Sequence, residues 1–149
     1  MTARRVALRC SGLLGLALVA VAYAQPRQPS WEVTVADKVT VAPGESSSIS
    51  VAIRVDRGLT VSKDASVIVD VQADPGVTVR KKRLGRMDAV DPEADAPRFA
   101  VAVKGDTAGE HAVRVRVRCW VCGGKSCRPI DVRKSATLSV VTPPTVAPP

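Results

Sequence analysis

Cysteines are the residues of this sequence best suited to chemistry. Three of its four cysteines lie in the segment RCWVCGGKSCRP, residues 118–129. Thiols at this density can bind a metal ion, form a structural disulfide, or exchange electrons through a reversible disulfide. The secondary structure expected around them helps to decide between these uses.

An alternation of valine and arginine leads into the cysteines. Val113, Val115 and Val117 alternate with arginines, as in a strand with one buried face. If the strand continues without a bulge, Cys119 points into the core and Cys122 points outward. On an extended strand their Cα atoms would lie about 10 Å apart, whereas a disulfide needs less than about 7 Å. Cys119 and Cys122 are therefore not expected to be bonded to each other.

Cys122 and Cys127 flank the segment GGKS, which suits a four-residue hairpin loop. Such a hairpin sets the two cysteines opposite each other, with Cα atoms about 4.5–5.5 Å apart. The same register gives favourable cross-strand pairs, namely Arg118–Asp131, Val117–Val132 and Cys119–Ile130. We predict a Cys122–Cys127 disulfide and a buried free thiol at Cys119.

A metal site is another possible use of these thiols. Cys119, Cys122 and Cys127 with His111, the only histidine, would supply four ligands. C-x2-C is a zinc spacing, but the expected second pair of ligands is missing. His111 would lie about 25 Å from Cys119 along a strand. The sequence therefore favours no metal and predicts no other cofactor.

The residues alone leave the use of the disulfide open. The bridge closes a very short loop, so the chain-entropy model allows it only about 2 kcal/mol of stabilisation. Exposed bridges of this kind are often reducible, and Lys125 and Arg128 beside the pair would favour a thiolate. Most disulfides of exported domains are nevertheless structural. A redox-active bridge and a structural one fit these residues about equally well.

The elements that must position the cysteines are strands. Apolar residues recur at every second position in residues 31–35, 49–55, 66–72, 99–103, 113–118 and 136–141, with Gly, Pro and Asp between them. This pattern predicts an all-β, immunoglobulin-like β-sandwich of about seven to nine antiparallel strands. The acidic segment 87–98 is predicted to be a long surface loop, and the proline-rich tail 142–149 to be disordered.

The N-terminus has the pattern of a secretory signal peptide. Arginines precede an apolar run, and Ala22-Tyr23-Ala24 forms a cleavage motif before Gln25. We expect Sec-type export to the periplasm or beyond, with cleavage after Ala24 and no membrane insertion afterwards. The domain would then span residues 25–141, in a compartment where disulfides persist. Loss of three arginines lowers the formal net charge from +8 to +5.

Basic residues are concentrated in two places. The segment RKKRLGR, residues 80–86, has no stacking aromatics beside it, so we interpret it as a solvated turn and expect no nucleic-acid partner. Arg114, Arg116 and Arg118 are most simply the solvent face of a strand. This arginine row leads toward the cysteines, however, and would suit an acidic partner.

The cysteine segment and its flanking strands resemble the N-terminal periplasmic domain of the DsbD thiol:disulfide interchange protein. The resemblance covers about residues 31–141. It rests on CGGKSC followed by Arg128-Pro129, on PRFAVAVKGDTAGEHAVRVRVRC upstream, and on TVAPGESSSISVAIRV nearer the N-terminus. That domain is an immunoglobulin-like sandwich, the same fold that the alternation predicts.

The resemblance implies a stand-alone module for thiol–disulfide exchange, a component of a protein-disulfide reductase system. Cys122–Cys127 would accept electrons from a membrane donor and pass them to other exported oxidoreductases. Cys127 would form the mixed disulfide and Cys122 would resolve it. The family covers its pair with an aromatic cap loop. The counterpart here, residues 57–60, has no aromatic residue, and Trp120 would cover part of the pair instead.

The residues expected to support the pair are Cys119, Trp120, Lys125, Arg128 and Pro129. The alternative function is a non-enzymatic, immunoglobulin-like binding or structural module whose disulfide is only a staple.

Overall fold

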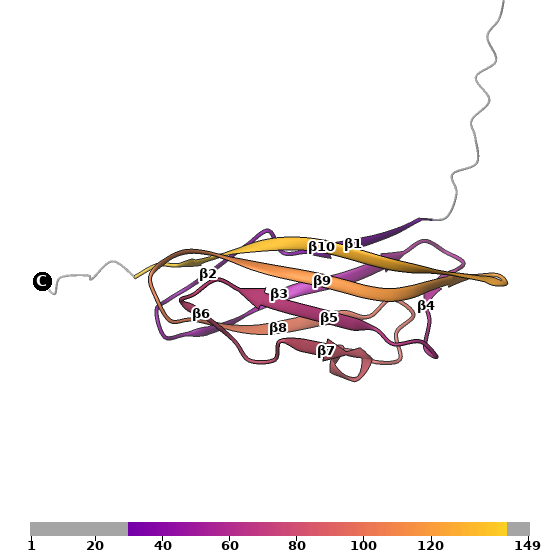
Figure 1. Ribbon diagram of the computed structural model, residues 1–149, viewed down its shortest axis with the longest axis horizontal. Coiled ribbons are helices and arrows are strands. Elements are labelled where there is room, and N and C mark those ends of the chain that lie inside the picture. Colours follow the sequence, from indigo (N-terminus) through magenta and orange to yellow (C-terminus); the bar gives the residue numbers. More distant parts are fainter. Residues whose placement is uncertain (1–29, 143–149) are drawn as a thin grey trace, which may run out of the picture.

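Strands dominate residues 30–142, the part of the chain that the computed structural model describes (Figure 1). Ten strands and one three-residue 3-10 helix lie in this range. Seven of the strands have four or more residues, and the other three have three residues each. The expected signal peptide lies outside the described residues, as do residues 143–149 of the predicted tail. The fold is the predicted immunoglobulin-like β-sandwich.

The smaller sheet has four antiparallel strands in the order β1-β3-β8-β6. Their bounds are β1 (Trp31–Val35), β3 (Ser46–Val55), β8 (Arg98–Gly105) and β6 (Val77–Val79). In β3, Ile49, Val51 and Ile53 are buried, while Ser50 between them is exposed and Ala52 is half-buried. The period of two therefore sets one face of this sheet against the core.

The larger sheet holds the cysteines. Its path is β2-β10-β9-β5-β7, and a sixth strand, β4, pairs with the end of β9. The bounds are β2 (Lys38–Val41), β4 (Leu59–Val61), β5 (Ile68–Ala73), β7 (Arg83–Gly85), β9 (Gly109–Gly123) and β10 (Ser126–Val140). β9 and β10 form a long hairpin whose tip projects at the right of Figure 1.

One strand pair departs from the antiparallel expectation, since β2 runs parallel to β10. The cause is a change of sheet between β1 and β2. Ala36 N–H still donates to Ser50 O in the smaller sheet, whereas Asp37 O accepts from Thr137 N–H in the larger one. The chain thus crosses the sandwich without a hairpin, and β2 enters the second sheet beside β10.

The core lies between the two sheets and is mostly aliphatic. β9 contributes five consecutive inward residues, each exposed by 4% or less: Val113, Val115, Val117, Cys119 and Val121. β3 and β8 face them with isoleucine, valine and Phe99. With so few aromatics, β-branched side chains supply most of the buried apolar surface.

The basic and acidic segments between β6 and β8 are joined to each other and to the larger sheet. In the segment 80–86, Lys81 pairs with Asp88 at 2.6 Å and Arg83 pairs with Asp70 at 2.6 Å. The 3-10 helix η1 (Arg86–Asp88) follows, and the chain reaches β8 through the predicted acidic loop. Two residues of that loop, Ala89 and Pro97, are buried, so the loop is packed onto the sandwich.

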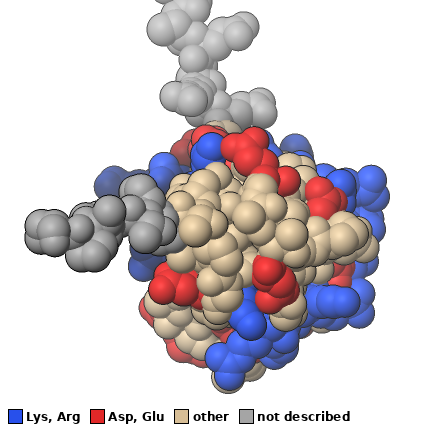
Figure 2. All heavy atoms as spheres, turned by 90° about the vertical axis from the view of Figure 1, so that its left-hand side faces the viewer, with Lys and Arg blue, Asp and Glu red and all other residues tan. Residues whose placement is uncertain are grey.

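Charge is unevenly distributed over the surface. Figure 2 shows the end of the molecule away from the β9–β10 tip, where uncharged residues fill the centre and Lys and Arg gather toward the lower right. Among the described residues no helix has the length and apolar character needed to cross a bilayer. A further group of basic residues lies on the outer face of the larger sheet.

Candidate redox site

Cys122 and Cys127 are joined by a disulfide at the tip of the β9–β10 hairpin, as predicted. The register is also as predicted, with Cys122 opposite Cys127 and Cys119 opposite Ile130. Arg118 lies opposite Asp131, although the ion pair of Asp131 is with Arg116. Strand parity thus places the disulfide on the outer, solvent-facing side of the larger sheet.

The turn beyond the disulfide is shorter than predicted. Gly123 and Ser126 continue the ladder, so only Gly124 and Lys125 form the loop instead of four residues. Gly124 has a φ of 57°, the positive value that a two-residue hairpin turn requires at its first position. The cysteine Cα atoms are 4.0 Å apart, closer than the predicted 4.5–5.5 Å. They form the second residue pair from a two-residue turn, and this pair exchanges no backbone hydrogen bonds. In antiparallel strands the Cα atoms approach most closely at such pairs.

The two sulfur-bearing residues differ in their neighbours. Cys127 is exposed, while Cys122 is half-buried because β4 lies against it. Thr60 of β4 is the partner of Cys122, and Leu59 is the partner of Gly123. A Cβ on Gly123 would lie only 2.4 Å from Leu59 Cδ2, so glycine permits this close approach. The segment 57–60, expected to correspond to the cap loop, therefore flanks the pair on the Cys122 side.

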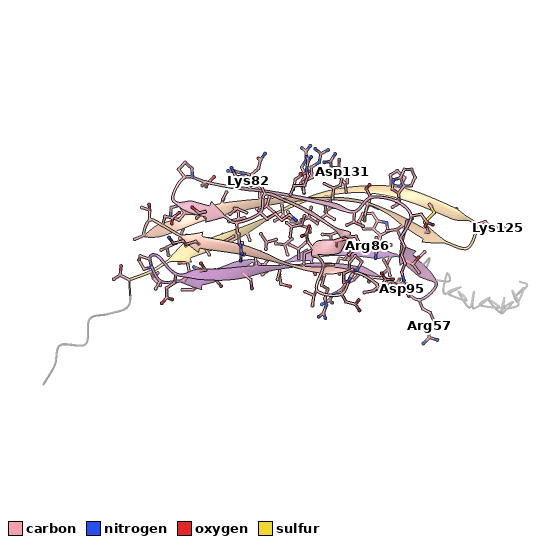
Figure 3. The ribbon with its side chains drawn as sticks, turned by 90° about the horizontal axis from the view of Figure 1, so that it is seen from below. Arg57, Lys82, Arg86, Asp95, Lys125 and Asp131 are labelled. Carbon is pink, nitrogen blue, oxygen red and sulfur yellow. A yellow bond between two sulfur atoms is a disulfide. The ribbon has the colours of Figure 1, made fainter. Side chains whose placement is uncertain are left out.

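Arg86 holds β4 in place, and nothing in the sequence pointed to this role. Its Nη2 donates to Val61 O at 2.8 Å and to Ser62 O at 3.0 Å. Its Nη1 donates to Pro92 O and Ala94 O of the acidic loop. Figure 3 shows Arg86 near the middle of the view and not at the edge of the molecule. Because all four partners are backbone carbonyls, no residue pattern could have revealed them.

The predicted supporting residues lie near the disulfide, but Arg128 and Cys119 occupy inward positions of their strands. Trp120 and Pro129 are cross-strand partners adjoining the cysteine pair on the outer side, and Trp120 is 43% exposed. Lys125 occupies the tip of the hairpin (Figure 3). Arg128 lies opposite the inward Val121 on β10 and is exposed. Neither forms an ion pair with a carboxylate in the described part of the chain. Both cations are thus available to favour a thiolate.

Cys119 differs from the other supporting residues, because it is buried in the core. It is a free thiol with 3% of its surface exposed. Burial raises the pKa of the Cys119 thiol to about 11, against a smaller lowering by the nearby Arg86 cation. At neutral pH the thiol is therefore protonated and is a poor nucleophile.

The residues considered as a metal site do not converge. His111 lies near the other end of β9, where its Nε2–H donates to Thr107 O at 2.8 Å. Cys119 points inward, whereas Cys122 and Cys127 are bonded to each other on the outer face. Within residues 30–142 no three His, Cys, Asp or Glu side chains are grouped so as to bind a metal ion.

No protein-family model matches this sequence, and no curated protein matches it. Two solved structures with a similar chain course are fimbrial subunits. AggA, the major subunit of aggregative adherence fimbriae type I from Escherichia coli, is 10% identical at a TM-score of 0.39, covering 77% of this chain and 97% of its own. The CooA pilin subunit from enterotoxigenic Escherichia coli is 15% identical at a TM-score of 0.33, covering 76% and 98%. Such values carry no argument about function, which therefore rests on the site.

Proposed function

We propose that this chain is an exported thiol–disulfide exchange module of the DsbD N-terminal type, with Cys122–Cys127 as its redox-active pair. The placement of the disulfide carries the proposal. It bridges two neighbouring strands already held by a long ladder and a two-residue turn, and it does not join the two sheets. A bridge so placed adds little constraint to the chain, while it lies on the surface where a partner thiol can reach it.

The asymmetry of the pair supports separate roles for its two sulfurs. A partner thiolate attacks Sγ of the exposed Cys127, the S–S bond breaks, and Cys122 leaves as a thiolate. A second thiol of the partner then attacks the mixed disulfide, releasing Cys127 as a thiolate and leaving the partner oxidised. In the reverse direction the Cys127 thiolate attacks a client disulfide, and Cys122 resolves the intermediate. Lys125 and Arg128 stabilise the thiolates in both directions.

The remaining parts of the proposal concern location and partners. The N-terminal pattern of residues 1–24 supports export with cleavage after Ala24. The partners are a membrane electron donor and exported oxidoreductases, as the family resemblance implies. Trp120 and Pro129 form a small apolar surface beside the pair that a partner can contact.

The reduction potential of Cys122–Cys127 is the first test. We expect equilibration with dithiothreitol or glutathione to give a potential within the range of exchange proteins, about −120 to −270 mV. Replacing both cysteines with serine should lower the free energy of unfolding by at most about 2 kcal/mol, because the closed loop is short. A potential below about −300 mV, or a much larger loss of stability, would identify the bridge as a staple of a non-enzymatic module.

Trapping of mixed disulfides is the second test. In the exported compartment a Cys122→Ser variant should accumulate mixed disulfides through Cys127, because the resolving thiol is gone. Cys127→Ser is the matched control and should trap far less, since the remaining thiol is half-covered by β4. Cys119→Ser should behave as the wild type. Equal trapping by both single variants would contradict the assigned roles.

A further inference from the structure

The outer face of the larger sheet bears a shallow hollow of about 1160 Å³ over β5, β9 and β10. We call it the basic groove, because seven of its twelve lining residues are basic: Lys82, Arg83, Arg114, Arg116, Arg118, Arg133 and Lys134. Figure 3 shows Lys82 and Asp131, which pairs with Arg116, on the same side of the molecule. The arginine row seen in the sequence forms the centre of this groove.

The groove retains positive charge after its ion pairs are counted. Asp70 lies 2.6 Å from both Arg83 and Arg118, while Asp74 and Asp131 pair with arginines of β9. Lys134 lies opposite the inward Val115, so six outward basic side chains against these three carboxylates leave a net charge of +3. Lys82, Arg133 and Lys134 have no carboxylate within 4.0 Å among residues 30–142.

The opposite sheet shows that this charge is not a general property of the surface. In the middle of β3 and β8 the outward residues are Ser48, Ser50, Ala52, Ala100 and Ala102, and the cations Arg54, Arg98 and Lys104 lie at the ends of these strands. Each sheet has one face in contact with solvent, and small side chains such as serine and alanine are sufficient for that contact. The concentration of arginine on one sheet therefore requires a reason other than exposure.

The groove and the disulfide belong to one continuous face. On β9, Arg118, Trp120 and Cys122 alternate outward in that order, and on β10 Arg133 and Cys127 share the same face. Arg118 is four residues and Arg114 eight residues from Cys122, or about 13 Å and 26 Å along the strand. A domain of about 100 residues, with a radius of gyration near 13 Å, is large enough to touch both the disulfide and the groove.

We propose that the basic groove docks an acidic surface of the redox partner and so delivers the partner thiol to Cys127. This inference rests on the proposed function. A protein is favoured over a sulfated or phosphorylated polymer because carboxylates such as Asp70 and Asp131 lie among the arginines, where a uniform polyanion would be repelled. Trp120 and Pro129, between groove and disulfide, add an apolar contact suited to a protein surface.

Two synthetic cysteine peptides test the proposal. One carries four glutamates spaced to reach the groove, and the other carries glutamines in their place. Rates of Cys122–Cys127 reduction are followed by acid quench, alkylation and mass spectrometry. At low salt the glutamate peptide should react about tenfold faster than the glutamine peptide, and the advantage should fade at 0.5 M NaCl. Equal rates at low salt would overturn the proposal.

Matched charge changes locate the effect. Lys82→Ser with Arg133→Ser removes two groove cations without leaving a carboxylate unpaired, and it should abolish most of the glutamate advantage. Arg54→Ser with Arg98→Ser removes the same charge from the smaller sheet and should preserve it. Reduction by dithiothreitol should be unchanged in both. An advantage that survives the groove variant, or falls equally in both variants, would contradict docking in the groove.

Failure of the redox function has a different signature. If neither peptide nor dithiothreitol reduces the disulfide, the proposed function fails, and docking is then judged by binding of a Cys-to-Ser glutamate peptide. That peptide should bind the wild type at least tenfold more tightly than the groove variant. Binding of a heparin oligosaccharide together with no binding of the glutamate peptide would assign the groove to a polyanion and overturn the proposal.

Discussion

The two faces of β9 give the same residue type opposite properties. Cys119 and Cys122 are three residues apart, yet one faces the core and the other faces solvent. The first is a protonated thiol whose pKa burial raises to about 11, and the second is half of a surface disulfide. The alternation of a strand thus separates a buried thiol from a surface disulfide within one short segment.

The division into an inner and an outer face also determines which residues of the larger sheet stabilise the fold. The inward residues of β9 from Val113 to Val121 and Val69 and Val71 of β5 are apolar and almost fully buried, whereas outward positions carry arginines and their carboxylate partners. Burial of apolar surface stabilises the fold, and exposed ion pairs add little to it. The outer face is therefore free to vary for the sake of binding, and the inner face is not.

Adjacent substitutions in β5 give the largest expected contrast. Val71 is 1% exposed, and Val71→Asp buries an unpaired charge, so we expect loss of the folded state or a cost of several kcal/mol. Gln72→Asp introduces the same residue on the outer face, opposite Arg114, and should leave stability within about 0.5 kcal/mol. Urea unfolding followed by circular dichroism measures both. Similar losses in the two variants would refute the assignment of faces.

The period of two in the sequence made the β9–β10 hairpin predictable. The faces of β9, the register of the hairpin and the burial of Cys119 all follow from alternation and a glycine turn, which are local properties of the sequence. The position of β4 beside Cys122 was expected only from the family resemblance, because a strand of three residues is too short to show an alternation of apolar and polar residues. Arg86 was interpreted as part of a solvated turn, because its carbonyl partners leave no trace in residue types. The parallel entry of β2 depends on a change of sheet that local pattern does not encode.

Alkylation of the reduced protein should separate the thiols by about two orders of magnitude. At pH 8 a thiol of pKa 11 is about 0.1% ionised, against about a quarter for an ordinary cysteine, so Cys119 should react at least about 200-fold more slowly than Cys122 or Cys127. Its rate should continue to rise up to about pH 11, where the thiolate becomes the major form. Iodoacetamide labelling with peptide mass spectrometry measures all three rates.

Denaturant provides the control for this comparison. In 8 M urea the three cysteines should react at similar rates, because burial no longer suppresses the Cys119 thiolate. Rapid native labelling of Cys119 at pH 8 would show that the inner face opens and that the third thiol is available for exchange.

The smallest expected effect concerns the outer ion pairs at acid pH. The hydrogen bond from Arg83 holds the pKa of the Asp70 carboxyl below its ordinary value; burial opposes this lowering, and Arg118 adds to it. Because the folded-state pKa is the lower one, the stabilisation is present above the unfolded-state pKa of about 4 and is lost as the pH falls from there through the folded-state pKa. Asp70→Asn should therefore cost less than about 1 kcal/mol at pH 7, and this difference should shrink as the pH falls below about 4. Asp64→Asn, at an exposed position with no ion pair within residues 30–142, should cost nothing at either pH. Thermal unfolding across this pH range measures both variants. An Asp70→Asn difference that stayed constant down to pH 2 would mean that the carboxylate charge is irrelevant, and that the arginines of the outer face are not held by it.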